Sequence, residues 1–241
     1  MENLRDALSI VGCVMKRKGK ENMYTFLLLL IYLAFISLGL PDSLLGSAWP
    51  VMHEAFQVPL SYAGMVTMII SGGTICSSLM SERLTKKFGT QIVTVFSVML
   101  TAIALFGFST ASAFWMLCLW TIPYGLGAGA IDAALNNYVA LHYNSRHMSW
   151  LHCFWGLGTI ISPYVMSYAL TTSVWQNGYR MVSFIQIGIA LILFVTLPIW
   201  KVNKKETAQE EKAEEEMVGI KGALKIKGVP NLLLGLSLIH I

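Results

Sequence analysis

Two aspartates, Asp42 and Asp132, each stand as the lone acidic residue of a long apolar run. Ionised carboxylates are unfavourable away from water, so such groups usually face a cavity, where they carry protons or contact a polar solute. The structural alternative is that either aspartate caps a helix break or hydrogen-bonds to a neighbouring helix. Because two such residues occur in separate runs, we favour function and predict both as proton-coupling residues.

The run YGLGAGAIDAALNNYVALH, residues 124–142, adds further residues at helical spacing. Asn136 follows Asp132 by four residues, so the two side chains share one helical face, which a water-filled cavity explains. Asn137 comes next, and we predict that both asparagines bind the solute. A second stripe consists of small residues that repeat every four positions: Gly125, Gly129 and Ala133. Such a stripe lets another helix approach closely.

The run WLHCFWGLGTIISPY, residues 150–164, places His152, Trp155 and Thr159 at positions i, i+3 and i+7 of one helical face. Imidazole and indole groups hydrogen-bond to polar ligands, and histidine also relays protons. We therefore predict His152 and Trp155 as substrate-binding residues. For His152 the spacing leaves a second interpretation open, an aromatic belt with Trp150 at a membrane boundary.

The composition of the chain indicates the class of protein that contains these residues. Of the 241 residues, 55% are hydrophobic and 12% are charged, whereas a soluble domain has about 25% charged residues. The hydrophobic residues come in blocks of about 20, the length that crosses a bilayer core. The sequence therefore predicts an all-α membrane protein that spans the bilayer several times.

We expect a six-helix transmembrane bundle over residues 23–200 and the start of a seventh span over residues 229–235. The predicted spans are Tyr24–Pro50, Ser61–Met80, Gln91–Ser109, Phe114–Val139, Trp150–Thr171 and Met181–Trp200. Residues 201–228 include the mixed-charge run KKETAQEEKAEEEM, which predicts a solvated linker.

Lysine and arginine predict the orientation. All of them except Arg180 fall in segments on one side of the predicted spans, and such residues favour the cytoplasmic side. We therefore expect residues 1–22 and the linker to be cytoplasmic and the protein to lie in the cell's inner (plasma) membrane.

The two ends of the chain differ in sequence from the predicted spans. Residues 1–22 contain no apolar core of a secretory signal, and Met15 or Met23 would be an equally natural start. The last six residues, LSLIHI, match the translation of one frame of a widely used transposase sequencing adapter. We therefore expect residues 236–241 to derive from an adapter and leave them out of the fold.

No enzymatic constellation is found in the sequence. There is no Walker loop or zincin pattern, and the G-x-G steps fall within predicted membrane helices. Cys13, Cys76, Cys118 and Cys153 have no paired spacing, and the last three look like small buried apolar residues. We expect no catalysis, no cofactor, no metal site and no nucleic-acid partner.

Six spans, a charged linker and a seventh span resemble the N-terminal half of a major facilitator superfamily transporter. The patterns LPDSLLGSAWP, GAGAIDAALNNYV and WLHCFWGLGTIISP resemble the fucose-permease-like branch. By that resemblance Asp42 and Asp132 match acidic residues that serve proton coupling and sugar recognition, and Asn136 matches the asparagine that follows.

The sequence also departs from this family. In SERLTKKFGTQ, residues 81–91, Lys86 stands where the superfamily's loop carries an acid, and Thr90 and Gln91 replace a basic pair. Asp132 replaces the glutamate that fucose-type symporters tend to have, so fucose itself does not follow.

The resemblance implies secondary active transport, which we interpret as proton-coupled symport of a sugar or similar small polar solute. The expected partners are that solute, the proton, the lipid bilayer and a C-terminal half that the chain lacks. The alternatives are a proton-coupled efflux antiporter for drugs or metabolites, and a non-transporting membrane receptor or scaffold.

Overall fold

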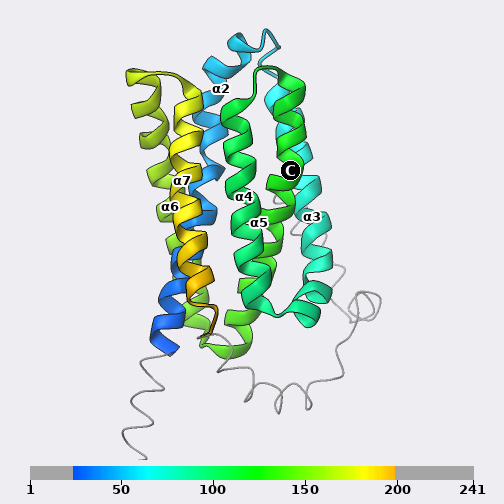
Figure 1. Ribbon diagram of the computed structural model, residues 1–241, viewed down its shortest axis with the longest axis vertical. Coiled ribbons are helices and arrows are strands. Elements are labelled where there is room, and N and C mark those ends of the chain that lie inside the picture. The colour runs from blue at the N-terminus through cyan, green and yellow to red at the C-terminus, as the bar shows by residue number, and fades with distance from the viewer. Residues whose placement is uncertain (1–23, 199–241) are drawn as a thin grey trace, which may run out of the picture. The chain divides into compact units, whose positions relative to one another are not determined.

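Six long apolar helical segments make up residues 24–198, the part of the chain that the computed structural model describes (Figure 1). The first segment, Tyr24–Ala55, is interrupted at Ser43 and continues as α2 (Leu44–Ala55). The others are α3 (Tyr62–Phe88), α4 (Thr90–Thr110), α5 (Phe114–His142), α6 (Ser145–Thr172) and α7 (Trp175–Val195). Each is long and apolar enough to cross a membrane, and residues 24–198 contain no strand. The predicted all-α class is confirmed.

Four predicted segments lie outside the described residues: the N-terminal segment, the charged linker, the start of the seventh span and the LSLIHI tail. Most of the predicted spans were shorter than the helices, and the sixth, predicted as Met181–Trp200, corresponds to α7 at Trp175–Val195. The helix α3 continues to Phe88 instead of Met80, and α6 begins at Ser145 instead of Trp150. The thickness of the bilayer predicts only the length of the apolar part of a helix. The helix itself continues until a residue interrupts its backbone hydrogen bonds. At α3 that end is Gly89, which has a φ of 87°.

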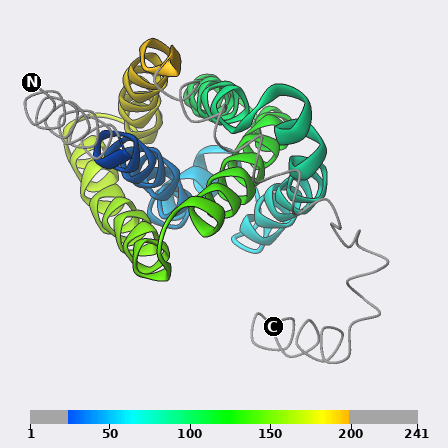
Figure 2. The same cartoon turned by 90° about the horizontal axis from the view of Figure 1, so that it is seen from below.

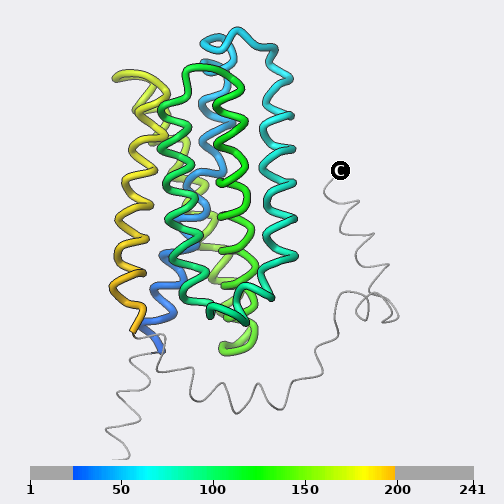
Figure 3. The backbone as a smooth tube through the Cα atoms, turned by 45° about the vertical axis from the view of Figure 1, so that its right-hand side comes forward, coloured from blue at the N-terminus to red at the C-terminus, as the bar shows by residue number. Residues whose placement is uncertain are grey.

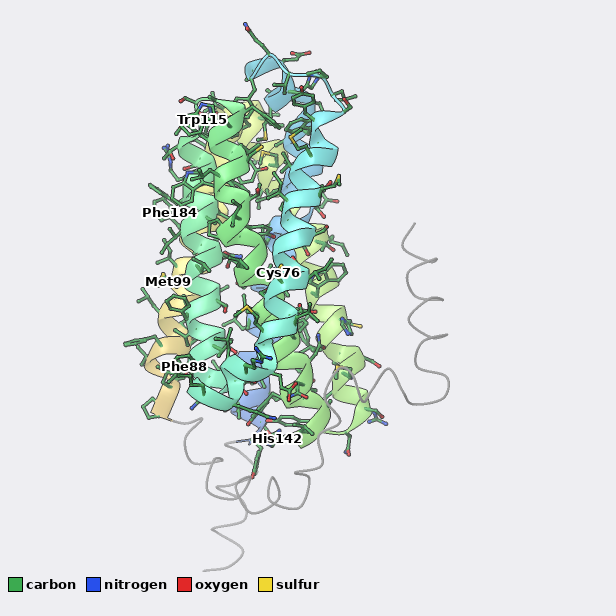
Figure 4. The ribbon with its side chains drawn as sticks, turned by 90° about the vertical axis from the view of Figure 1, so that its right-hand side faces the viewer. Cys76, Phe88, Met99, Trp115, His142 and Phe184 are labelled. Atoms are coloured by element: carbon green, nitrogen blue, oxygen red, sulfur yellow. The ribbon has the colours of Figure 1, made fainter. Side chains whose placement is uncertain are left out.

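The described basic residues are distributed between the two ends of the bundle as the charge pattern requires. The α3–α4 and α5–α6 connections lie at one end together with the start of the first segment, and the α4–α5 and α6–α7 connections lie at the other (Figure 1). Phe88 and His142 mark the first end in Figure 4, and Trp115 marks the second. Lys86 and Lys87 thus lie at the end opposite Arg180, which is in the first turns of α7. Which end is cytoplasmic stays a prediction.

The helix α5 packs closely against α3 through the predicted small-residue stripe, as the end-on view illustrates (Figure 2). A β-carbon at Gly125 would lie 2.5 Å from the carbonyl oxygen of Ile70 on α3. One turn on, a β-carbon at Gly129 would meet the backbone of Thr74. The hydroxyl of Ser78 donates to the carbonyl of Gly129 at 3.2 Å. The prediction of a close helix approach at Gly125 and Gly129 is confirmed.

A second close approach joins the first segment to α6. Figure 3 traces the first segment in blue from one end of the bundle to the other. Halfway along it, a β-carbon at Gly39 would meet the carbonyl of Trp155, and one at Gly158 would lie 2.9 Å from the backbone nitrogen of Leu40. Because glycine has no side chain, these two residues let the backbones of the first segment and α6 approach each other closely.

The helices α3 and α6 leave much of their apolar surface uncovered within residues 24–198. Only 11% of the most apolar window of α3 is buried, and 22% of that of α6. Cys76 on α3, which Figure 4 labels, and Cys153 on α6 are exposed, so the expectation that they are buried was wrong. An apolar sequence in a membrane protein indicates removal from water, which lipid provides as well as protein does.

Candidate functional site

A cavity of about 330 Å³ lies between the first segment, α3, α5 and α6. Its volume is within the usual range of small-molecule sites, about 300–1,000 Å³. The lining residues are Phe35, Leu38, Asp42, Ile70, Thr74, Tyr124, Ala128, Asp132, His152 and Trp155. Both predicted carboxylates therefore face one cavity, and none of the lining residues is a lysine or arginine.

Asp42 lies where the first segment is interrupted, and both of its carboxylate oxygens accept hydrogen bonds from other helices. The Tyr124 hydroxyl on α5 donates to Oδ1 at 3.0 Å, and the Trp155 indole Nε1 on α6 donates to Oδ2 at 2.8 Å. Both donors are neutral, so they orient the carboxylate without cancelling its charge. Asp42 is therefore fixed in position at the wall of the cavity.

Asp132 pairs with the asparagine one turn after it. Asn136 Nδ2 donates to Asp132 Oδ1 at 2.9 Å, as the shared helical face predicted. The amide oxygen of Asn136 is buried and has no hydrogen-bond partner among the described residues. A buried acceptor without a donor is unfavourable, so this oxygen is suited to receive a hydroxyl or water.

His152 contacts the first segment and lines the same cavity. Its ring packs edge-on against Phe35, with centroids 6.2 Å apart and an interplanar angle of 86°. His152 and Trp150 are both exposed, but only His152 lines the cavity.

The structure brings most of the predicted site residues together. Asp42, Asp132, His152 and Trp155 line the cavity, and Asn136 lies outside the lining but hydrogen-bonds to Asp132. Asn137 is exposed on α5 and is not part of the lining.

Sequence reasoning missed Tyr124, Phe35 and Thr74 as cavity residues. A signal for Tyr124 was present, because it precedes Asp132 by eight residues and Asn136 by twelve. Tyr124 is thus about two helical turns before Asp132, so the polar residues of α5 that line the cavity begin two turns before the predicted Asp132. Phe35 had a signal as well, because it precedes Asp42 by seven residues, the spacing of one helical face. Thr74 had none, because no site residue was predicted on its helix.

A second concave region, of about 360 Å³, lies at the α5–α6 connection and is lined by Leu141, His142, Tyr143, Asn144 and His147. Its contacts join helix ends: the Tyr32 hydroxyl lies 2.9 Å from His147 Nδ1, and the Tyr143 hydroxyl donates to the Tyr24 carbonyl at 3.2 Å. Burial raises the pKa of Tyr143 well above its ordinary value, so this hydroxyl stays a donor. We interpret this region as a tie between helix ends, since no carboxylate lines it.

Comparison with known proteins identifies relatives of the chain. The family profile described as Major Facilitator Superfamily matches residues 10–240. The chain is also similar to the protein named Bypass of stop codon protein 6 from Saccharomyces cerevisiae, with 24% identity over 163 residues. That match covers 66% of this chain and 33% of the yeast protein, so the chain spans about a third of the length of this curated relative.

Proposed function

The chain belongs to the major facilitator superfamily of membrane transporters, and from that premise we propose that it is part of a proton-coupled symporter for a sugar or similar small polar solute. Carriers of this kind bind their solute near the middle of the membrane and expose the site alternately to each side. The patterns LPDSLLGSAWP and GAGAIDAALNNYV resemble the fucose-permease-like branch, and this resemblance supports a sugar as the solute and a proton as the coupling ion.

The observation that carries the proposal is the pair of carboxylates, Asp42 and Asp132, around one cavity whose lining contains no lysine or arginine. Two negative charges in a region of low dielectric are unfavourable unless they are neutralised. Protonation neutralises them, so the loaded carrier changes its conformation without moving a buried charge. Proton binding and solute binding then favour the same state of the protein.

The hydrogen bonds of Asp42 indicate which oxygen takes the proton. The indole N–H of Trp155 only donates, so Oδ2 must remain an acceptor. A tyrosine hydroxyl both donates and accepts, so Tyr124 is able to rotate its hydrogen away and accept from a protonated Oδ1. We therefore assign the proton to Oδ1 of Asp42.

The solute would contact the remaining groups of the wall. His152 and the exposed part of the Trp155 ring offer a hydrogen-bonding group and an aromatic face, the combination that small polar ligands usually require. Asn136 lies outside the cavity lining and would act on the solute through its hydrogen bond to Asp132. Asn137 remains a weaker candidate, because it is exposed as well as outside the described lining.

Replacing Tyr124 with phenylalanine is expected to slow proton-driven uptake roughly tenfold. A hydrogen bond to a charged group contributes about 1.5–3 kcal/mol, and 1.4 kcal/mol corresponds to a tenfold change. The measurement is the initial rate of uptake under a fixed pH gradient. Tyr164→Phe is the matched control, because Tyr164 is 74% exposed on α6 and outside the cavity. Equal rates in the two variants would remove Tyr124 from proton transfer.

We also propose the plasma (inner) membrane with a cytoplasmic N-terminus, on the basis of the basic residues near Lys86, Lys87 and Arg146. A cysteine introduced beside Arg180 should then react with an impermeant maleimide added to intact cells. A cysteine introduced beside Arg146 should react only after the cells are opened. The reverse pattern would invert the assigned topology.

Efflux by proton antiport is a second candidate, because two carboxylates beside Trp155 and Phe35 also suit an amphipathic cation. The direction of coupling separates the two functions. Acid on the outside drives uptake in a symporter and export in an antiporter.

The test uses a complete carrier that contains these spans, reconstituted in proteoliposomes with an alkaline interior. Radiolabelled hexoses and 6-deoxyhexoses are offered one at a time, and a cationic dye is offered in parallel. Symport predicts accumulation of at least one sugar above its external concentration, and a protonophore should abolish it. Accumulation of none of the sugars, with proton-dependent movement of the dye alone, would replace symport by the efflux function.

A further inference from the structure

Pro41, one residue before Asp42, removes a backbone hydrogen bond from the first segment. In an α-helix the N–H of residue 41 donates to the carbonyl of residue 37, and proline has no N–H. Ser37 is only 1% exposed, so water is not available to its carbonyl. This carbonyl therefore depends on a donor from another part of the protein.

Gln186 on α7 supplies this donor. Its side-chain Nε2 donates to the carbonyl oxygen of Ser37 at 2.6 Å, and the glutamine is fully buried. At its other end, Oε1 lies 3.1 Å from the hydroxyl of Thr101 on α4, whose single hydrogen is shared with the carbonyl of Val98 at 2.9 Å. Only the amide nitrogen is able to donate to a carbonyl, so the contact with Ser37 determines which way the amide points.

The surroundings of Gln186 are apolar on both sides along the bundle. One apolar cluster includes Leu38 and Ile189, and a separate one includes Leu40 and Val182. A buried amide in such surroundings is unfavourable unless its groups are hydrogen-bonded. The two contacts of Gln186 thus account for a polar side chain between two apolar clusters.

We propose that Gln186 is a positioning residue that satisfies the carbonyl freed by Pro41 and thereby holds Asp42 within reach of Trp155 and Tyr124. The carbonyl of Ser37 lies five residues before Asp42 on the same segment. The importance of this contact for transport rests on the proposed function, whereas the contact itself does not.

The first test is a rescue experiment on thermal stability in the complete protein. Gln186→Met keeps the length of the side chain but removes the donor, so the melting temperature should fall by several degrees. Pro41→Ala restores an N–H to the helix, so the double variant should recover most of that loss, including any loss of folded yield. Ser183→Ala is the matched control, because Ser183 is fully buried on the same helix and donates to the carbonyl of Ala102 at 2.8 Å. Pro41→Ala should not rescue it.

The second test asks whether Asp42 moves. Trp155→Phe removes the indole donor to Asp42 and should lower the melting temperature of the otherwise unchanged protein. In the Gln186→Met background, and in the double variant with Pro41→Ala, it should have no further effect, because Asp42 is no longer beside residue 155. A purely structural glutamine would leave the effect of Trp155→Phe the same in all backgrounds.

Two results would overturn the proposal. One is a failure of Pro41→Ala to rescue Gln186→Met, or an equal rescue of Ser183→Ala. The other is an undiminished effect of Trp155→Phe in the Gln186→Met protein. Neither measurement involves a solute, so a failure of the symport proposal would leave both results interpretable.

Discussion

Replacing Asp42 with asparagine is expected to abolish proton-driven accumulation while downhill exchange of solute continues. With one proton per solute, a gradient of about one pH unit corresponds to about 1.4 kcal/mol and thus supports roughly tenfold accumulation. Asparagine resembles the neutral carboxyl group in shape and charge but binds no proton, so this accumulation should fall to about onefold. Uptake is measured in proteoliposomes with and without the pH gradient.

Glu54→Gln is the matched control for this prediction. Glu54 is an exposed carboxylate of the same segment, on α2, and lies outside the cavity. It should accumulate solute as the unchanged protein does. A loss of downhill exchange in Asp42→Asn as well would mean that Asp42 binds the solute and not only the proton.

Asp132→Asn distinguishes the two carboxylates. If both are needed for coupling, this variant should also lose accumulation, and the hydrogen bond from Asn136 would still be possible through an amide oxygen. Intact pH-driven accumulation in both variants would contradict the coupling assignment altogether.

Replacing Gly158 with alanine is expected to destabilise the bundle and separate Trp155 from Asp42. The added β-carbon would meet the carbonyl of Ile36 and lie 2.9 Å from the backbone nitrogen of Leu40, where only backbone movement makes room. Overpacking of this kind costs about 1–3 kcal/mol. Each kcal/mol lowers the melting temperature of a protein of this size by roughly 2–4 °C.

Gly156→Ala provides the control for the crossing. Gly156 is on the same helix two residues earlier, and a β-carbon there would have no atom within 4 Å. Alanine favours a helix over glycine by about 1 kcal/mol, so this variant should be as stable as the unchanged protein or slightly more stable. Equal melting temperatures for the two variants would show that the first segment and α6 do not cross as closely as described.

Both predictions concern the same small region, since the crossing at Gly39 and Gly158 positions the residues that hold Asp42. Gly39 precedes Asp42 by three residues, and Gly158 follows Trp155 by three. A movement at the crossing is therefore transmitted directly to the hydrogen bond between Trp155 and Asp42. This explains why a substitution that touches no solute is expected to change the site.

The sequence by itself determined the class of protein, the six spans and the two carboxylates within them. These properties are local: the length of an apolar run follows from bilayer thickness, and a charge within such a run is unusual wherever the helix lies. The pairing of Asp132 with Asn136 was also predictable, because a spacing of four fixes the helical face.

Only the tertiary structure decided which residues of different helices meet. Asp42 contacts Tyr124, 82 residues away, and Trp155, 113 residues away, while Gln186 reaches Ser37 across 149 residues. Such contacts depend on how each helix is rotated and how closely it approaches its neighbours. That geometry is set by the packing of all six segments together, with glycines at the crossings, and no single run of residues contains it.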